Sequence, residues 1–202
     1  MVILRELLAS YKVILASESP RRRELLSGLD IDFEVEVNGK FEEKMEEGIP
    51  AIQLPEHLSR LKSKSFGREI VSGEIIITAD TLVVCAGEIL GKPKGEREAV
   101  AMLNRLSGRS HQVITGITIR SLEQLRSFSV TSEVWFRPLQ REEIEYYVEH
   151  YKPFDKAGGY GIQEWIGYTA IEKIEGSYFN VVGLPVQKLN DELTKFILSL
   201  QA

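Results

Sequence analysis

The sequence has one cysteine, three histidines and no apolar run that approaches the length of a membrane span. A single cysteine excludes an internal disulfide, and Cys85 stands in the apolar run 82–86, which favours a packed core thiol over a nucleophile. The histidines show no metal-ligand spacing, so a zinc site is not expected. The first residues are too charged for the apolar part of a signal peptide. We therefore expect a cytoplasmic protein.

Positive charge is also in deficit, because 25 Lys and Arg face 30 Asp and Glu, a formal net charge of −5. This balance argues against non-specific binding to nucleic acid or to an anionic membrane. Local basic clusters on an acidic protein fit a small anionic ligand better. With 202 residues, 43% of them hydrophobic, the chain can bury a substantial core. We expect one domain over residues 1–202.

Short strand patterns alternate with helical ones, which predicts an α/β or mixed α+β domain. The β-branched run Glu74–Thr78 predicts a buried strand that ends at Asp80, with residues 82–85 continuing toward a turn. Further strands are expected at 13–15, 32–38, 112–120, 127–136 and 169–174. Helices are expected at 20–26, 50–69, 96–107, 141–151 and 185–200, with Pro55 marking a bend or the true start of the second.

The segment from Val13 to Leu26 predicts a buried strand, a serine-rich turn and a helix that is capped by Ser19 and has Pro20 at its first position. Three arginines, Arg21, Arg22 and Arg23, then fall in the first turn, where each misplaced cation costs roughly 0.3–1 kcal/mol. Free backbone N–H groups and guanidinium groups at a helix start favour a phosphate site. The alternative is a solvated basic turn.

Two single residues are candidates for chemistry. Asp80 follows a buried run, and a carboxylate at a strand end can hold a metal or activate water. Alone, an aspartate at this place is more typical of a turn. Lys92 can reach a phosphate as a point charge, although a turn lysine is usually solvated.

Two loops and one helix add further candidates. The acidic loop 41–47 holds four carboxylates, and one of them could share a divalent cation with Asp80, although such runs are usually solvated. Lys62 and Lys64 lie on the expected second helix and could join the phosphate site or face water. The glycine-rich loop 155–163 matches neither the P-loop nor the dinucleotide fingerprint. Its Gln163 could read a base through the side-chain amide.

Taken together and in order, these segments resemble the Maf family of nucleoside triphosphate pyrophosphatases along nearly the whole chain. The matching segments are Ala16-Ser17-x-Ser19-Pro20-Arg21-Arg22, Ala79-Asp80-Thr81, Gly91-Lys92-Pro93, Leu106-Ser107-Gly108, Asp155-Lys156-Ala157-Gly158-x-Tyr160-Gly161-Ile162-Gln163, Gly176-Ser177 and Val182-Gly183-Leu184-Pro185.

The resemblance implies a two-lobed, ITPase-like α/β fold with a long mixed sheet, a cleft between the lobes and a homodimer. It implies hydrolysis of a nucleoside triphosphate to the monophosphate and pyrophosphate with Mg²⁺ or Mn²⁺. Asp80 then resembles the general base or metal-bound carboxylate, and Glu42 the second acidic metal ligand, with Glu43 as the alternative register. The residues that resemble phosphate-binding groups are Ser17, Arg22, Lys62 and Lys92.

The resemblance also extends to a branch of the family. Arg21, Thr81 and Gln163 stand where the dTTP/UTP-cleaving branch has Arg, Thr and Gln. Lys156 lies in the segment Asp155-Lys156-Ala157-Gly158, which is also typical of that branch. The segment 164–166 departs from the branch, which usually has a small, glycine-containing segment there. The indole of Trp165 could therefore narrow or re-aim the base pocket.

Two other functions are compatible with parts of this pattern. One is a nucleotide-binding regulator of septum formation and cell division that does not turn its ligand over; the intact set of Arg22, Asp80 and Lys92 speaks against it. The other is nucleic-acid binding through the arginine cluster, which the acidic charge and the lack of an aromatic-basic stripe disfavour. The resemblance leaves the physiological nucleotide open, and a modified pyrimidine triphosphate would suit a house-cleaning role.

Overall fold

The computed structural model describes residues 3–37 and 48–201, which form two compact units. Unit 1 comprises residues 1–80, 115–130 and 183–202, and unit 2 comprises residues 81–114 and 131–182. The chain therefore leaves unit 1 within one long strand and returns to it twice. Within the described residues, no helix is both long enough and apolar enough to cross a membrane.

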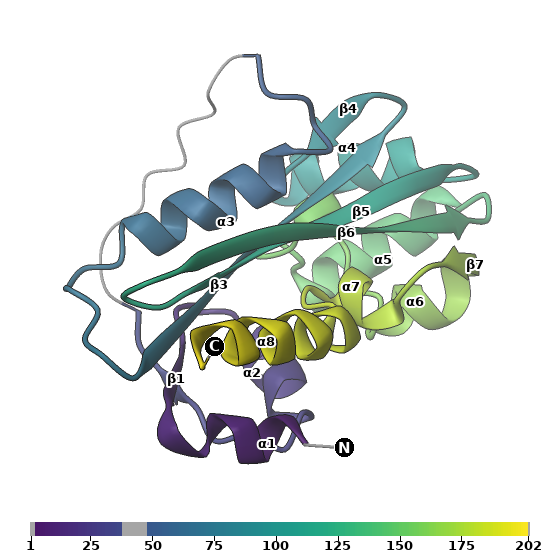
Figure 1. Cartoon of the computed structure of the whole chain (residues 1–202). Helices are drawn as coiled ribbons and strands as arrows, with labels where there is room; N and C mark the ends of the chain where they lie inside the picture. Colours follow the sequence, from purple (N-terminus) through teal and green to yellow (C-terminus); the bar gives the residue numbers. More distant parts are fainter. Residues whose placement is uncertain (1–2, 38–47, 202) are drawn as a thin grey trace. The chain divides into compact units, whose positions relative to one another are not determined.

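The strands form one mixed sheet in the order β2-β1-β3-β5-β6-β7, with β4 paired to β3 (Figure 1). β1 runs parallel to both β2 and β3, whereas β3–β4 and β6–β7 are antiparallel pairs. The bounds are β1 Lys12–Leu15, β2 Glu34–Val35, β3 Glu74–Cys85, β4 Glu88–Leu90, β5 Ser110–Arg120, β6 Leu125–Phe136 and β7 Ile171–Glu175. The prediction of a mixed α/β fold with a long mixed sheet is confirmed.

Unit 1 packs helices onto an aliphatic core. Its helices are α1 Leu4–Leu7, α2 Pro20–Ser27, α3 Leu54–Lys64 and α8 Val186–Leu200. The core is continuous from Leu15 and Ile77 on the strands to Leu189 and Phe196 on α8, all with side chains at most 1% exposed. Complete burial of such side chains stabilises the unit by about 1.5–3 kcal/mol each.

Unit 2 has its own core and its own helices. These are α4 Glu96–Leu106, α5 Arg141–Tyr151, α6 Trp165–Ala170 and α7 Tyr178–Val182. Leu103, Phe136 and Tyr147 are among its fully buried side chains. The glycine-rich loop packs into this core through Tyr160.

Several predicted boundaries are corrected by the structure. Residues 74–85 form one uninterrupted strand, so Asp80 lies inside β3 and not at a strand end. Within residues 32–37 the expected strand is only two residues long. The expected helix 50–69 begins at Leu54, next to the alternative start at Pro55, and ends at Lys64. Thr169, expected in a strand, belongs to helix α6, and the short helix α7 was not predicted. These boundaries depend on tertiary contacts, which can override the local pattern of the sequence.

A buried histidine lies in the core of unit 2. His111 is 2% exposed, its Nε2 is 2.7 Å from the Tyr160 hydroxyl, and its ring packs edge-on against Phe136 and Tyr160. Burial lowers the pKa of His111 from 6.5 to about 4, because the apolar surroundings disfavour the imidazolium.

We therefore expect His111 to make the folded state sensitive to mild acid. The pKa of His111 is lower in the folded state than in the unfolded state. The stability that the neutral imidazole contributes is therefore complete above pH 6.5 and is lost as the pH falls toward 4. Between pH 7 and pH 5 the free energy of unfolding should fall by about 2 kcal/mol on this account. Urea unfolding of the wild type and of His111→Gln at pH 7 and pH 5 measures this fall in the free energy of unfolding. His150→Gln, at an exposed position, is the control. An equal pH dependence in wild type and His111→Gln would contradict the assignment.

Candidate functional site

The turn between β1 and α2 is built by two serines. The Ser19 hydroxyl accepts a hydrogen bond from the Arg22 backbone N–H at 3.4 Å, which confirms the predicted helix cap. The Ser17 hydroxyl accepts from the Ser19 N–H at 3.3 Å and from the Arg22 guanidinium at 3.4 Å. The turn therefore places Ser17 and the arginine side chain together at the start of a helix, where the dipole favours anions.

Arg22 ties this turn to two distant parts of unit 1. Its Nη1 donates to the carbonyl of Ala79 at 2.8 Å, and its Nε donates to the carbonyl of Gly183 at 3.0 Å. Ala79 directly precedes Asp80 in β3. The guanidinium is thus fixed beside the residue that precedes the catalytic candidate. Arg21 lies one residue earlier in α2 and is half-buried.

Asp80 forms an ion pair with Lys62, which comes from the last turn of α3. The Asp80 side chain is 9% exposed and the Lys62 side chain 23%. Breaking such a partly buried pair leaves an uncompensated charge, so the two side chains hold each other in place. The structure therefore brings Ser17, Arg22, Lys62 and Asp80 together within unit 1. Lys64, the weaker candidate, is exposed.

Polar contacts and one glycine hold α3 against the sheet. The Ser59 hydroxyl bonds to Thr118 at 2.8 Å, and the Thr78 hydroxyl donates to the Ser59 carbonyl at 2.7 Å. Gly116 in β5 lies directly under the first turn of α3, where a Cβ would be 2.2 Å from the backbone of Pro55 and Glu56. This contact fixes the distance between α3 and the sheet, and with it the position of Lys62.

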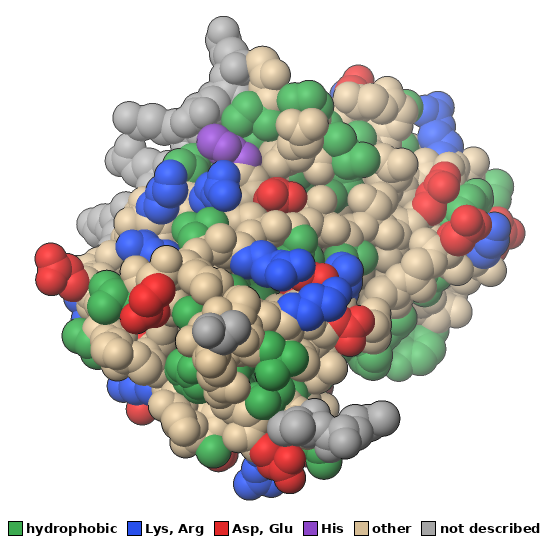
Figure 2. Space-filling view, in the orientation of Figure 1, with side chains coloured by type: hydrophobic (Ala, Val, Ile, Leu, Met, Phe, Trp, Pro, Cys, Tyr) green, Lys and Arg blue, Asp and Glu red, His purple; other side chains and the backbone are tan. Residues whose placement is uncertain are grey.

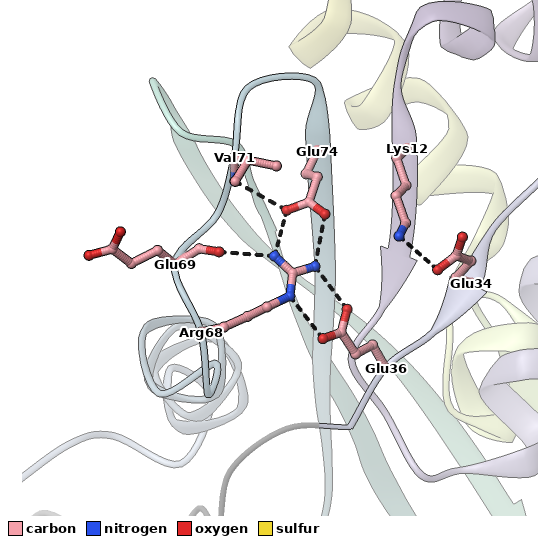
Figure 3. Close-up of polar contacts among 7 residues, drawn as sticks. All are labelled: Lys12, Glu34, Glu36, Arg68, Glu69, Val71 and Glu74. Atoms are coloured by element: carbon pink, nitrogen blue, oxygen red, sulfur yellow. Dashed lines mark hydrogen bonds and ion pairs between the residues drawn. The ribbon is translucent and has the colours of Figure 1, made fainter.

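A second polar cluster in unit 1 was not predicted from the sequence. Figure 3 shows the Arg68 guanidinium held between the carboxylates of Glu36 and Glu74, with N–O distances of 2.7–2.9 Å. These hydrogen bonds lower the pKa of both carboxyl groups. The cluster joins the residue after β2 to the start of β3. A separate pair, Lys12 with Glu34 at 2.9 Å, links β1 to β2.

Unit 2 contains the other candidates. Thr81 follows Asp80 in β3 and is half-buried, whereas Lys92 is exposed in the loop after β4. That loop contacts the glycine-rich loop, because the Gly158 N–H donates to the carbonyl of Gly91 at 3.0 Å.

The glycine-rich loop itself carries two candidates. Lys156 is buried beside Asp155, with the two charged atoms 2.8 Å apart. The Gln163 side-chain oxygen is buried and has no hydrogen-bond partner within residues 3–37 and 48–201. An unpaired buried acceptor is costly, typically by about 1–3 kcal/mol, so this oxygen is a candidate acceptor for the donor of a ligand.

The metal candidates are sparse in the part of the chain that the structure describes. Glu42 and Glu43 lie outside the described residues. Within those residues, no group of three or more His, Cys, Asp or Glu side chains could hold a metal ion. Of the predicted metal ligands, Asp80 is the one that lies within the described residues. Its carboxylate fits a Mg²⁺ that is held by one or two carboxylates together with substrate phosphates and water.

Charge is mixed on the surface. Figure 2 shows lysine and arginine side chains interspersed with carboxylates on the face that it draws, without one continuous basic surface.

The chain belongs to the Maf family, because the family model described as Maf-like protein matches residues 12–196. A relative from Parabacteroides distasonis, named dTTP/UTP pyrophosphatase, is 51% identical over 95% of this chain and 99% of its own length. Proteins of the same name from Bacteroides thetaiotaomicron and Phocaeicola vulgatus are 48% and 50% identical over 93% and 94% of this chain, and over 97% and 98% of their own lengths. Among solved structures, a HAM1 protein from Coxiella burnetii aligns over 92% of this chain and 99% of its own at 16% identity, with a TM-score of 0.46.

Proposed function

We propose that this protein is an enzyme that hydrolyses dTTP and UTP to the monophosphate and pyrophosphate. Relatives with about half of their residues identical carry the name of that activity. Two structural observations support it most: Lys62 pairs with Asp80, and Arg22, bonded to Ser17, also bonds to the carbonyl of Ala79, the residue before Asp80. A carboxylate paired with a cation and next in the chain to a residue that anchors a second cation suits attack on a phosphoanhydride.

The phosphate oxygens are bound by the hydroxyl and cationic groups. Ser17 and the start of α2 supply neutral donors, while Arg22, Lys62 and Lys92 supply charge, with Arg21 contributing from the same turn as Arg22. Such groups act mainly by positioning the chain of phosphates and by stabilising charge in the transition state.

Asp80 accepts a proton from the attacking water, or orients that water, for in-line attack at the α-phosphorus. The ion pair with Lys62 holds the carboxylate in place for this step. We propose Asp80 as a ligand of a divalent cation, Mg²⁺ or Mn²⁺, with Glu42 as the second acidic ligand. When bound, the cation neutralises charge on the phosphates and on the leaving pyrophosphate.

Thr81, Lys156 and Gln163 recognise the nucleoside. Uracil and thymine present an N3–H donor between two carbonyl acceptors. The buried, unpaired Gln163 oxygen supplies an acceptor for that N3–H, and its amide NH₂ supplies a donor for a neighbouring carbonyl. Thr81 adds a hydroxyl that can serve as either donor or acceptor.

Arg22→Ala should raise the KM for dTTP about tenfold to one hundredfold, because each hydrogen bond to a charged group contributes about 1.5–3 kcal/mol. Steady-state kinetics measure this, with exposed Arg23→Ala in the same helical turn as the matched control. Since Arg22 also braces Ala79 and Gly183, Arg22→Lys is measured in parallel and should show an intermediate KM. An unchanged KM in a folded Arg22→Ala protein would remove Arg22 from the phosphate site.

The proposed function is tested by turnover of canonical and modified nucleoside triphosphates with Mg²⁺ or Mn²⁺. Pyrophosphate and orthophosphate are quantified separately. Pyrophosphate release fastest with dTTP, UTP or a modified pyrimidine triphosphate supports both the reaction and the base preference. Pyrophosphate released fastest from a purine would keep the reaction and overturn the assignment of Thr81 and Gln163. Binding of every nucleotide without turnover would instead favour the regulator of septum formation.

We further propose that the active form is a cytoplasmic homodimer, with residues 1–202 acting as one functional domain in a house-cleaning role. The support is the family resemblance of the sequence motifs. Sedimentation equilibrium of the purified protein tests the dimer, and a monomer at assay concentration would contradict it.

A further inference from the structure

The Lys156 ammonium is held by two carboxylates. Its Nζ is 2.8 Å from Asp155 Oδ1 and 3.0 Å from Glu164 Oε1, and its side chain is only 10% exposed. A cation that is already compensated by two anions is a weak anchor for a phosphate. The pair with Glu164 therefore fixes the loop more than it attracts the triphosphate.

Glu164 also joins the loop to helix α5. The Tyr147 hydroxyl donates to Glu164 Oε2 and accepts the Gly161 backbone N–H at 2.9 Å. Tyr147 is fully buried, and burial together with the hydrogen bond to Glu164 raises its pKa, so the hydroxyl stays protonated. One carboxylate thus links Lys156 at the start of the loop, Gly161 near its end and the helix behind it.

Gly161 leaves room for this arrangement. A Cβ at this position would be 2.9 Å from Glu164 Cδ and 3.0 Å from Lys156 Cε, so the ends of these two side chains would have to shift. The missing side chain lets the two charged groups meet across the loop. Gln163, whose side-chain oxygen is buried, is the residue directly before Glu164.

We propose that Glu164 is a positioning residue that sets base preference by fixing the backbone on both sides of Gln163, at Gly161 and at residue 164, and with it the place of the Gln163 amide. An amide whose place can shift can offer its donor or its acceptor to the base and so tolerates both cytosine, whose N3 accepts, and uracil or thymine, whose N3–H donates. A fixed amide leaves a buried group unpaired with the wrong base, which is the stronger basis for discrimination. This inference rests on the proposed function.

Glu164→Gln tests the inference, because it keeps the shape of the side chain and removes the ion pair with Lys156. The ratio of kcat/KM for dTTP to that for dCTP should fall at least about tenfold, with kcat for dTTP within about threefold of wild type. Tyr147→Phe, which removes both hydroxyl contacts, should lower the same ratio. Matched controls are Glu149→Gln and Tyr168→Phe, at exposed positions of unit 2.

The ratio of kcat/KM for dTTP to that for dCTP distinguishes a positioning role of Glu164 from a role in supporting the fold alone. An equal loss of activity on every nucleotide, or an unchanged ratio in both variants, would overturn the inference. If Glu164→Gln fails to fold, Tyr147→Phe and Glu164→Asp give the ratio instead, and Glu164→Asp should restore part of the preference.

Binding of product distinguishes this inference from the proposed function. Calorimetric titration of wild type and Glu164→Gln with dTMP and dCMP, without metal, measures base preference in the absence of turnover. Wild type that prefers dTMP, with a preference that Glu164→Gln abolishes, supports the inference even if dTTP is not hydrolysed. Wild type that binds dTMP and dCMP equally would overturn it even if dTTP is hydrolysed.

Discussion

Asp80→Asn should lower kcat for dTTP by about a thousandfold while leaving the protein folded. The substitution preserves volume and removes the negative charge, so the side chain can neither take up a proton nor hold a cation, and general-base catalysis alone contributes about 10²–10⁴-fold. Lys62 loses its charged partner, which should cost some stability without unfolding the protein. Steady-state kinetics and thermal unfolding measure the two effects.

Asp32→Asn, at an exposed position of unit 1, is the matched control and should retain full activity. The Asp80→Asn variant should still bind dTMP with an affinity within about tenfold of wild type, since Ser17, Arg22 and Gln163 are unchanged. Near-normal turnover in this variant would remove the Asp80 carboxylate from the chemistry.

Gly116→Ala should destabilise the protein by about 3 kcal/mol or more and abolish most activity. A Cβ at residue 116 would overlap the backbone of Pro55 and Glu56 at 2.2 Å, and backbone in the first turn of a helix cannot yield as a flexible side chain does. Helix α3 must therefore move away from the sheet. Because α3 carries Lys62, the shift weakens the ion pair with Asp80 as well as the packing.

Urea unfolding and turnover of dTTP test this second expectation. Gly95→Ala is the matched control, since a Cβ there meets no atom within 4 Å and the extended backbone tolerates any residue. It should match wild type in both measurements. Wild-type stability and activity in Gly116→Ala would show that the spacing between α3 and β5 is not what positions Lys62.

The sequence predicted the local parts of the site well, because local rules decide them. Ser19 caps α2 as expected, since a serine before proline at a helix start satisfies a free N–H and proline needs none there. The α5 bounds, Arg141–Tyr151, were also predicted correctly from apolar spacing and the proline that follows.

The sequence could not show how the candidates hold one another. The Arg22 guanidinium binds carbonyl groups 57 and 161 residues away in the chain, and carbonyl acceptors leave no mark in sequence composition. Asp80 was expected at a strand end, yet β3 continues through it, because the residues on both sides find pairing partners that sequence does not reveal. The Lys62–Asp80 pair likewise depends on Gly116, whose role follows from a close backbone approach alone.

The segment 164–166 shows which part of a departure from a family pattern can be seen in the sequence. The sequence marked it as a departure from the dTTP/UTP branch and drew attention to the indole of Trp165. In the structure that ring lies edge-on to Tyr146, with ring centroids 5.1 Å apart, whereas the adjacent Glu164 makes the polar contacts to the loop. The carboxylate was not recognised because its partners, Tyr147 and Lys156, come together only in the folded unit.

Hydrolysis of dTTP in water enriched with ¹⁸O tests the central claim most directly, because it shows which phosphorus is attacked. Mass spectrometry of the products should find one ¹⁸O atom in dTMP and none in pyrophosphate, as attack at the α-phosphorus requires. Label in pyrophosphate, or release of orthophosphate in place of pyrophosphate, would contradict the proposed chemistry at Asp80.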